Sequence, residues 1–325
     1  MKKAQLSTQF NWIFVFIVGA IILIFFLYLI RAQTKSADKE LTGDILKNLE
    51  TVVKSSESTA GVVKVINIPS SNINFFCQED ISYYEIGSLR RDIPYDIIFS
   101  EDKLMGDKIV SWTQSWNVPF RISVFQYVST DNIYFLVVQD DHGLADELFN
   151  LLPANISKNK ISQTDLIKDL NFDHYKIIQF KDSEFTGTIE PVQGVDSLII
   201  NAPYGLNAYG QIEFVNEGVS VGFLKKESLL GAIYSADSNY YNCTMNKAFN
   251  RLELLLNLNK KRLAELETFV SDTDCNTTYS FSYDDMDEMI NHMNIQEVEN
   301  LHILSERIAR DNQKLIRGRN CPLIY

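Results

Sequence analysis

The first 56 residues combine an apolar stretch with an amphipathic one. Residues 12–30, WIFVFIVGAIILIFFLYLI, carry no charge, and Arg31 follows them. At 1.5 Å per residue this run is just long enough to cross a bilayer core of about 30 Å. Between residues 37 and 54, apolar positions recur at helical spacing with charges between them, and no proline occurs before residue 69. The pattern predicts one long helix over residues 5–56, transmembrane at about 11–30.

From about residue 62 to 225 the pattern changes to short runs rich in β-branched and aromatic residues, which is typical of strands. Helical patterns interrupt these runs at 142–152 and 161–170, and residues 129–132 and 216–218 read as turns between neighbouring strands. Strand, helix and strand in that order predict a crossover in a mixed sheet, within a mixed α/β domain at 62–240. The eight expected strands are VVKVINI, YDIIF, FRISVFQYV, NIYFLVV, HYKIIQF, SLIINA, QIEFV and VSVGFL.

The last third of the chain has a helical pattern. Apolar residues keep a heptad spacing between residues 245 and 270, and a second helix is expected at about 286–317. Two long helices with a short connection predict an antiparallel helical hairpin at 241–325, packed on the same body. The expected fold class is therefore α+β, with a mixed α/β body between a long N-terminal helix and a C-terminal hairpin.

All four cysteines lie in the body, and their even number suits two disulfides; four buried thiols are the alternative. A continuous helix separates Cys243 from Cys275 by roughly 45 Å, whereas a disulfide needs Cα atoms within about 7 Å. A hairpin would instead return Cys321 to the neighbourhood of Cys243. We therefore expect the pairs Cys243–Cys321 and Cys77–Cys275.

Composition and charge narrow the possible location and partners. A formal net charge of −12 argues against nucleic acid as a partner, because phosphate binding needs a basic face. Lysine and arginine flank the apolar run almost equally on both sides, so the positive-inside count does not fix the orientation. The cysteines and three glycosylation sequons, at Asn155, Asn242 and Asn276, favour a cytoplasmic N-terminus and an extracytoplasmic body on the cell membrane.

Candidate chemistry is sparse. The sequence has four histidines and none of the common metal, phosphate or nucleophile motifs. Asp140, Asp141 and His142 follow an expected strand and precede an expected helix, where α/β proteins often bind ligands. Carboxylates beside an imidazole can bind a metal or move protons, but acidic residues also cap helix N-termini. We expect no catalysis, no metal and no cofactor, and keep these three residues as weak ligand candidates.

The residues before the apolar run form a recognisable pattern. Lys3 and Ala4 precede Gln5-Leu-Ser-Thr-Gln9, and the apolar run follows. This head resembles the class III signal of archaeal type IV pilin-like proteins, in which a basic and a small residue precede the cut. The resemblance covers only the N-terminal region and implies that residues 1–4 are a leader, cut by a prepilin peptidase between Ala4 and Gln5. The family's acidic residue at the fifth mature position is Gln9 here, and glutamine cannot neutralise a neighbour's N-terminal ammonium.

These observations lead to one expected function and one alternative. The chain is expected to be a membrane-anchored surface protein, a minor pilin-like or pseudopilin-like subunit of a surface filament, adhesion or secretion apparatus. Its partners would be the membrane, the prepilin peptidase and other pilin-like subunits. The alternative is an uncut bitopic protein whose extracytoplasmic domain binds or modifies a ligand.

Overall fold

The computed structural model describes residues 3–56, 60–68, 72–78, 81–168, 172–190, 194–270, 273–318 and 321–325. The chain separates into two compact units, residues 1–48 and residues 49–325. Each unit is described by itself.

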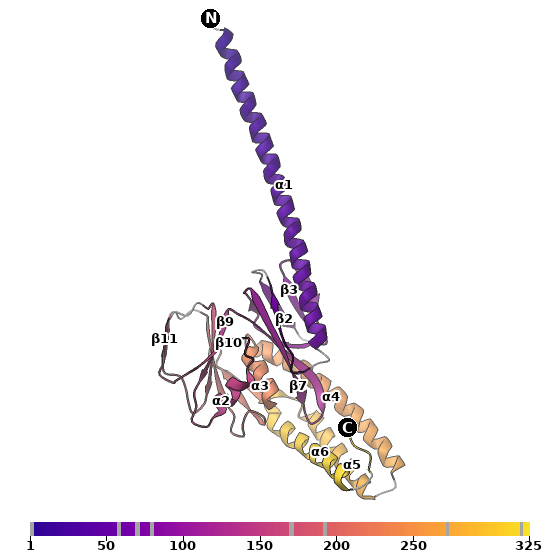
Figure 1. The fold of residues 1–325 in the computed structure, drawn as a ribbon. Helices are drawn as coiled ribbons and strands as arrows, with labels where there is room; N and C mark the ends of the chain where they lie inside the picture. The colour runs from indigo at the N-terminus through magenta and orange to yellow at the C-terminus, as the bar shows by residue number, and fades with distance from the viewer. Residues whose placement is uncertain are drawn as a thin grey trace. The chain divides into compact units, whose positions relative to one another are not determined.

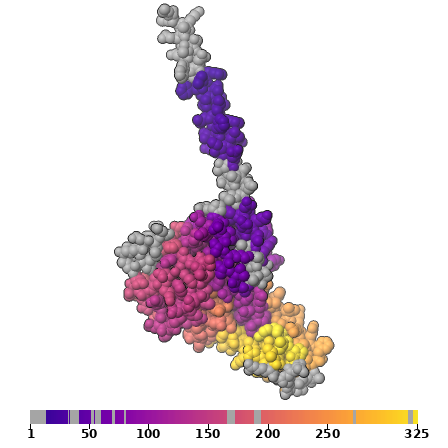
Figure 2. Space-filling model, in the orientation of Figure 1, coloured from indigo at the N-terminus to yellow at the C-terminus, as the bar shows by residue number. Residues whose placement is uncertain are grey.

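The first unit lies within helix α1, Lys3–Ser56, which is 54 residues long and ends inside the second unit. This confirms the prediction of one long N-terminal helix. Its stretch Phe14–Arg31 has a mean hydropathy of 2.7, and none of it is buried. Figure 2 shows this stretch in indigo, with its side chains around the helix. Among the described residues, this helix alone is long and apolar enough to cross a membrane.

The second unit contains three main sheets, and its 16 described strands include all eight expected ones. The first sheet has the order β1-β7-β8-β5, in which β5 is parallel to β8 and the other pairs are antiparallel. The sequence pattern missed β7, because this strand buries polar side chains: Gln126 of β8 donates a hydrogen bond to Ser111 of β7 at 2.7 Å. Its strands are β1 Val63–Asn67, β5 Ile97–Phe99, β7 Lys108–Asn117 and β8 Arg121–Thr130.

The second sheet is antiparallel, with the order β4-β3-β2-β6, and the sequence pattern did not predict it. Aromatic pairs across β2 and β3 support it: the rings of Phe76 and Tyr83 stack with centroids 4.7 Å apart. Cys77 also lies in β2. The strands of this sheet are β2 Ile73–Gln78, β3 Ile81–Ile86, β4 Leu89–Asp92 and β6 Lys103–Leu104.

The third sheet has six strands in the order β10-β9-β12-β14-β15-β16. The first four are parallel, and β15 and β16 are antiparallel additions. Helix α2, Leu144–Leu151, connects β9 to β10, which confirms the predicted crossover. The strands are β9 Ile133–Val138, β10 Ser157–Ile161, β12 His174–Phe180, β14 Val195–Asn201, β15 Tyr209–Phe214 and β16 Val219–Leu224.

Two local predictions in this region were wrong. The helix expected at 161–170 is instead a turn followed by β11, Leu166–Lys168, which pairs with β13, Thr188–Glu190. The side chain of Asp165 accepts hydrogen bonds from both the backbone N–H and the hydroxyl of Ser162, so the capping pattern closes a turn. Residues 129–132 do turn the chain, but β8 and β9 on either side belong to different sheets. The turn at 216–218 joins the antiparallel pair β15 and β16, as expected.

Helix α3, Lys225–Tyr234, packs on the first sheet and also contacts β15 and β16. Gly231 is required there, because a Cβ atom at this position would lie 2.7 Å from the ring of Phe99. Buried hydrogen bonds fix the same region: Tyr127 donates to the carbonyl of Glu227 at 2.8 Å, and Trp116 to that of Leu224 at 3.1 Å. The first sheet, α3 and the edge of the third sheet therefore share one core.

The C-terminal region contains three helices where two were expected, and they lie together in orange to yellow in Figure 1. Helix α4, Ser238–Phe269, buries the predicted heptad residues from Met245 to Leu263, whereas Leu266 and Val270 are half-buried. Helix α5, Thr273–Asn291, begins 13 residues earlier than the second helix was expected to begin. A 3₁₀ turn η1, Ile295–Glu297, then leads into α6, Val298–Gly318, so the expected second helix is two helices.

Candidate functional site

The sequence-predicted ligand candidates lie at the carboxyl edge of the parallel strands. The chain passes from β9 through α2 to β10 on one side, and then returns to β12 on the other side of β9. A reversal of strand order of this kind leaves a crevice outside the carboxyl ends of the strands. A hollow of about 370 Å³ occupies this place, and residues that follow β9, β12 and β14 line it, among them His142, Lys181, Asp182 and Asn201.

The carboxylate of Asp140 caps the N-terminus of α2, the helix that follows it. Its carboxylate accepts hydrogen bonds from the backbone N–H groups of His142 at 3.0 Å, Leu144 at 3.1 Å and Ala145 at 2.8 Å. These donors lie at the N-terminus of α2, which favours a negative charge. The helix-capping interpretation therefore accounts for Asp140.

Asp141 and His142 are exposed and line different hollows. Asp141 borders a second hollow of about 520 Å³, on the β10 side, with Asp146 and Lys160. Lys160 and Asp146 already form an ion pair at 2.7 Å. The three candidates therefore do not converge on one point: Asp140 borders both hollows, Asp141 the one on the β10 side, and His142 the crevice between β9 and β12.

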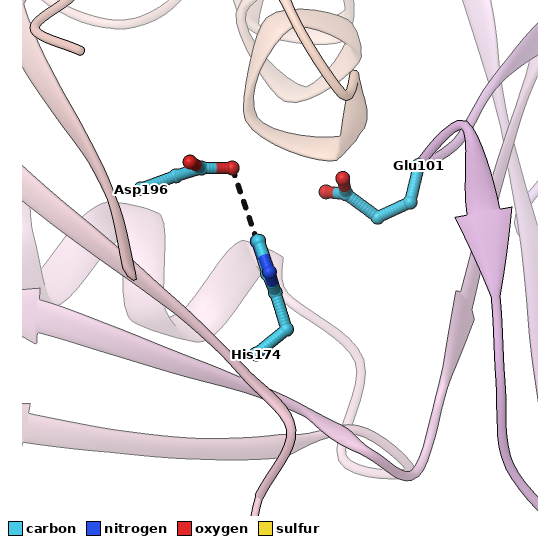
Figure 3. A group of neighbouring side chains, drawn as sticks. All are labelled: Glu101, His174 and Asp196. Atoms are coloured by element: carbon cyan, nitrogen blue, oxygen red, sulfur yellow. Dashed lines mark hydrogen bonds and ion pairs between the residues drawn. The ribbon is translucent and has the colours of Figure 1, made fainter. Parts of the chain in front are cut away.

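A second group of ionisable side chains was missed by the sequence pattern. Glu101, His174, Lys176 and Asp196, here called the buried charge cluster, come from the segment after β5 and from the amino ends of β12 and β14. Figure 3 shows His174 directed at Asp196, with Glu101 facing them from the other side. Nε2 of His174 and Oδ2 of Asp196 are 3.0 Å apart.

Lys176 is the centre of this cluster and is only 1% exposed. Its ammonium pairs with the carboxylate of Glu101 and donates to the carbonyls of Ile233 at 3.0 Å and Ser235 at 2.6 Å. These two carbonyls lie at the C-terminal end of α3, where the helix dipole favours a cation. All three ammonium donors are thus engaged, and a lysine of the third sheet is tied to the segment after β5 and to α3.

The two carboxyl groups of the cluster are shifted in opposite directions. Burial raises the pKa of Glu101, and the charges of Lys176 and His174 only partly offset this. Burial also acts to raise the pKa of Asp196, but the hydrogen bond from His174 and the charge of Lys176 outweigh it and lower that pKa. Asn216 supports the ionised form of Asp196 with a hydrogen bond at 3.0 Å.

The cluster has the donor set of a metal site but already contains a cation. One ligand atom from each of Glu101, His174 and Asp196 lies within 4.8 Å of the others, and such a set suits Zn²⁺ or Mn²⁺. A metal ion would have to displace the ammonium of Lys176 from Glu101, and would leave that ammonium buried. The arrangement is better explained as a structural charge network that joins two sheets through Lys176.

The disulfides join different cysteines from those expected. Cys77 pairs with Cys243, and Cys275 with Cys321, so the predicted pairs Cys243–Cys321 and Cys77–Cys275 were wrong. The expectation failed because α5 adds one more passage of the chain: Cys275 lies near the start of α5, and Cys321 follows the end of α6. The exclusion of a Cys243–Cys275 bond stands, since α4 is continuous beyond Cys243.

The three sequon asparagines occupy different environments. Asn155 is exposed in a turn before β10. Asn242 lies half-buried inside α4, and the side-chain nitrogen of Asn276 donates to the carbonyl of Val270 at 3.0 Å. Glycosylation modifies that side-chain nitrogen. Asn155 is therefore the most accessible acceptor, and glycosylation stays a prediction at all three positions.

The processing residues belong to the start of α1. The backbone of Lys3, Ala4, Gln5 and Gln9 is helical, but their side chains lie outside the described part of the structure, as do residues 1 and 2. Comparisons with known proteins add no further assignment. No protein-family model, curated protein or solved structure matches this chain.

Proposed function

We propose that this chain is a membrane-anchored surface protein, a minor pilin-like or pseudopilin-like subunit of a surface filament, adhesion or secretion apparatus, without catalysis. The observation that carries the proposal is α1, a single helix from Lys3 to Ser56 with an exposed apolar stretch at Phe14–Arg31. This exposed stretch of 18 residues, uncharged up to Arg31, needs a cover, either lipid or neighbouring helices. In a pilin-like subunit, lipid covers the apolar stretch while the chain is in the membrane, and neighbouring helices cover it after assembly.

The disulfides support an extracytoplasmic body. All four cysteines are paired, and such bonds persist in oxidising compartments outside the cytoplasm. The N-terminus would then be cytoplasmic, where a prepilin peptidase would cut between Ala4 and Gln5. Contacts with other pilin-like subunits would follow, although Gln9 supplies a hydrogen bond where the family has a charge.

The proposal includes an antiparallel arrangement of the C-terminal helices. Short connections between α4 and α5 and between α5 and α6 favour it. Such an array would present the exposed positions of α6, shown in yellow in Figure 2, as a surface for other subunits.

The leader is tested by mass spectrometry of the chain extracted from membranes of a host with a prepilin peptidase. We expect a mature N-terminus at Gln5, and an uncut chain for Ala4→Phe, because the cut requires a small residue before it. Lys35→Glu, beyond the apolar run, serves as a matched control and should still be cut. An intact MKKA head in the unchanged protein would overturn the pilin-like proposal and leave the uncut bitopic protein.

The crevice between β9 and β12 favours the second function, a bitopic protein that binds or modifies a ligand. His142, Lys181 and Asp182 meet there at the strand-order reversal, as ligand-binding groups of α/β sheets often do. A thermal-shift screen of small metabolites tests it with His142→Ala and Lys181→Ala. A ligand whose stabilisation both variants abolish, but Lys226→Ala outside the crevice does not, would establish this function. Stabilisation that neither variant changes would exclude this site.

A further inference from the structure

A hollow of the second unit, separate from those described above, has a basic lining. It has a volume of about 960 Å³ and lies among β5, the start of β8 and the outer face of α4. We call it the basic groove and define it by Lys54, Tyr95, Arg121, Ser123, Lys247 and Arg251. It shares no residue with the crevice at the carboxyl edge or with the buried charge cluster.

The charge of the groove is opposite to that of the protein. Four of its lining residues are cationic, and of the described lining residues Asp96 alone is acidic, in a chain of net charge −12. Lys54 pairs with Glu50 at 2.6 Å, whereas Arg121 and Arg251 have no ion pair among the described residues. Two arginines without an ion pair, in a groove with four cations and one acidic residue, indicate a place for an external anion.

The spacing on α4 strengthens this point. Lys247 and Arg251 are four residues apart, so they lie next to each other on one face of the helix. Like charges at that spacing repel each other and destabilise the helix. The ammonium of Lys247 also donates to the hydroxyl of Ser82, and an anion bound beside Arg251 would offset the repulsion between the two cations.

Three further side chains of the groove indicate which uncharged groups the ligand carries beside its anionic groups. Ser123 is 4% exposed, and its hydroxyl has no hydrogen-bond partner in the described structure, although buried hydroxyls normally have one. Tyr95 is 81% exposed and Leu254 is 68% exposed, so an aromatic ring and an apolar side chain lie open at the same groove. A ligand with hydroxyl groups and flat apolar faces satisfies both features.

We propose that the basic groove binds a segment of an acidic polysaccharide. Arginine holds carboxylate or sulfate groups through two parallel hydrogen bonds, and the faces of sugar rings pack on exposed aromatic side chains. A single small anion would fill little of about 960 Å³. An acidic peptide fits less well, because extended peptides usually add to a free strand edge, and β5, the strand at this groove, is fully buried.

The test uses the full chain in neutral-detergent micelles and three probes, measured by calorimetric titration. The probes are hexagalacturonate, its methyl ester, which keeps the rings without the charge, and hexaglutamate, which keeps the charge without the rings. We expect binding of hexagalacturonate that weakens as salt is added, and no binding of the ester. Arg121→Gln with Arg251→Gln should weaken hexagalacturonate binding by about tenfold to a hundredfold, from the loss of two charged hydrogen-bond donors.

Matched variants separate the groove from general charge. Arg262→Gln with Arg310→Gln removes two exposed arginines outside the groove and should leave binding unchanged. Tyr95→Ala should weaken hexagalacturonate binding but leave hexaglutamate binding unchanged. Because this substitution does not change the charge of the groove, it tests the aromatic contact alone. The proposal is overturned if hexagalacturonate does not bind, if the two arginine pairs have equal effects, or if hexaglutamate binds as tightly as hexagalacturonate. The last result would assign the groove to acidic peptides. This inference does not depend on cleavage of the leader.

Discussion

The buried charge cluster and the basic groove belong to the same unit but differ in whether their charged side chains have partners within the protein. In the cluster each of Glu101, His174, Lys176 and Asp196 has a partner at contact distance, and Lys176 has three. In the groove Arg121 and Arg251 have no ion pair among the described residues, and Asp96 is the one acidic residue of the described lining. Charges with internal partners hold the fold together, whereas charges without them are available to a ligand. Loss of stability should therefore follow changes in the cluster, and loss of binding should follow changes in the groove.

Removing the lysine of the cluster should have the largest effect. Lys176→Met keeps the length of the side chain but leaves Glu101 buried without its cation, and should cost about 3–5 kcal/mol of unfolding free energy. Urea unfolding followed by the fluorescence of Trp112 and Trp116, which are buried in β7, measures it. Adding Glu101→Leu should recover most of the loss, because no unpaired charge remains. Equal losses in the single and double variants would mean that packing, not charge, makes Lys176 important.

The pH dependence of stability should separate the two carboxyl groups of the cluster. The pKa of Asp196 is lowered in the folded protein, so its stabilisation is present above the unfolded pKa, near 4, and is lost as pH falls through the folded value. Asp196→Asn should therefore lose less stability between about pH 4 and pH 2 than the unchanged protein.

Glu101 should behave in the opposite sense, because its folded pKa is raised. Its contribution is present below the unfolded pKa and is lost as pH rises through the folded value. Glu101→Gln should remove that loss. Parallel pH profiles of stability for Asp196→Asn, Glu101→Gln and the unchanged protein would contradict the assigned directions.

Removing an arginine from the groove should barely change stability. Arg251→Gln removes the repulsion with Lys247 on α4, so the unfolding free energy should stay within about 0.5 kcal/mol of the original value, or rise by a few tenths. The same urea measurement tests it, and Arg262→Gln on the same helix is the control. A loss above 2 kcal/mol would give Arg251 a structural role and weaken the contrast between the two regions.

Added zinc should have no effect on the unchanged protein. Because Lys176 already supplies the cation beside Glu101, the melting temperature should be the same with excess Zn²⁺ as with a chelator. His174→Ala distinguishes binding here from binding elsewhere. A rise in melting temperature that this substitution abolishes would show that a metal can displace the lysine.

Much of the fold was readable from side-chain periodicity alone. The charge-free run at 12–30, the strands of the third sheet other than β10, which are rich in β-branched and aromatic residues, and the heptads of α4 all appear in the structure where the pattern placed them. The missed elements are those whose stability comes from contacts across the chain. Strand β10 reads SKNKI, without apolar alternation, and is a strand because it pairs with β9.

The buried charge cluster was harder to predict for the same reason. His174 and Lys176 lie two residues apart on one strand face, but all other pairs in the cluster are 20 to 95 positions apart in the sequence. A lysine between apolar neighbours in HYKIIQF was a usable signal, since a buried lysine needs a partner. Nothing in that stretch identifies Glu101, whose place follows from the pairing of β5 with β8.

The two disulfides also determine how the chain carries mechanical load. The Cys77–Cys243 bond bridges a sequence separation of 166, and the Cys275–Cys321 bond one of 46. A force applied between α1 and the C-terminus passes across these covalent links rather than through the segments they enclose. The third sheet and helix α6 lie inside the bridged segments, whereas Lys54, Lys247 and Arg251 of the basic groove lie outside them. A chain pulled between these ends can therefore lengthen only by the stretches outside the two loops, and these include the part of α4 that carries Lys247 and Arg251.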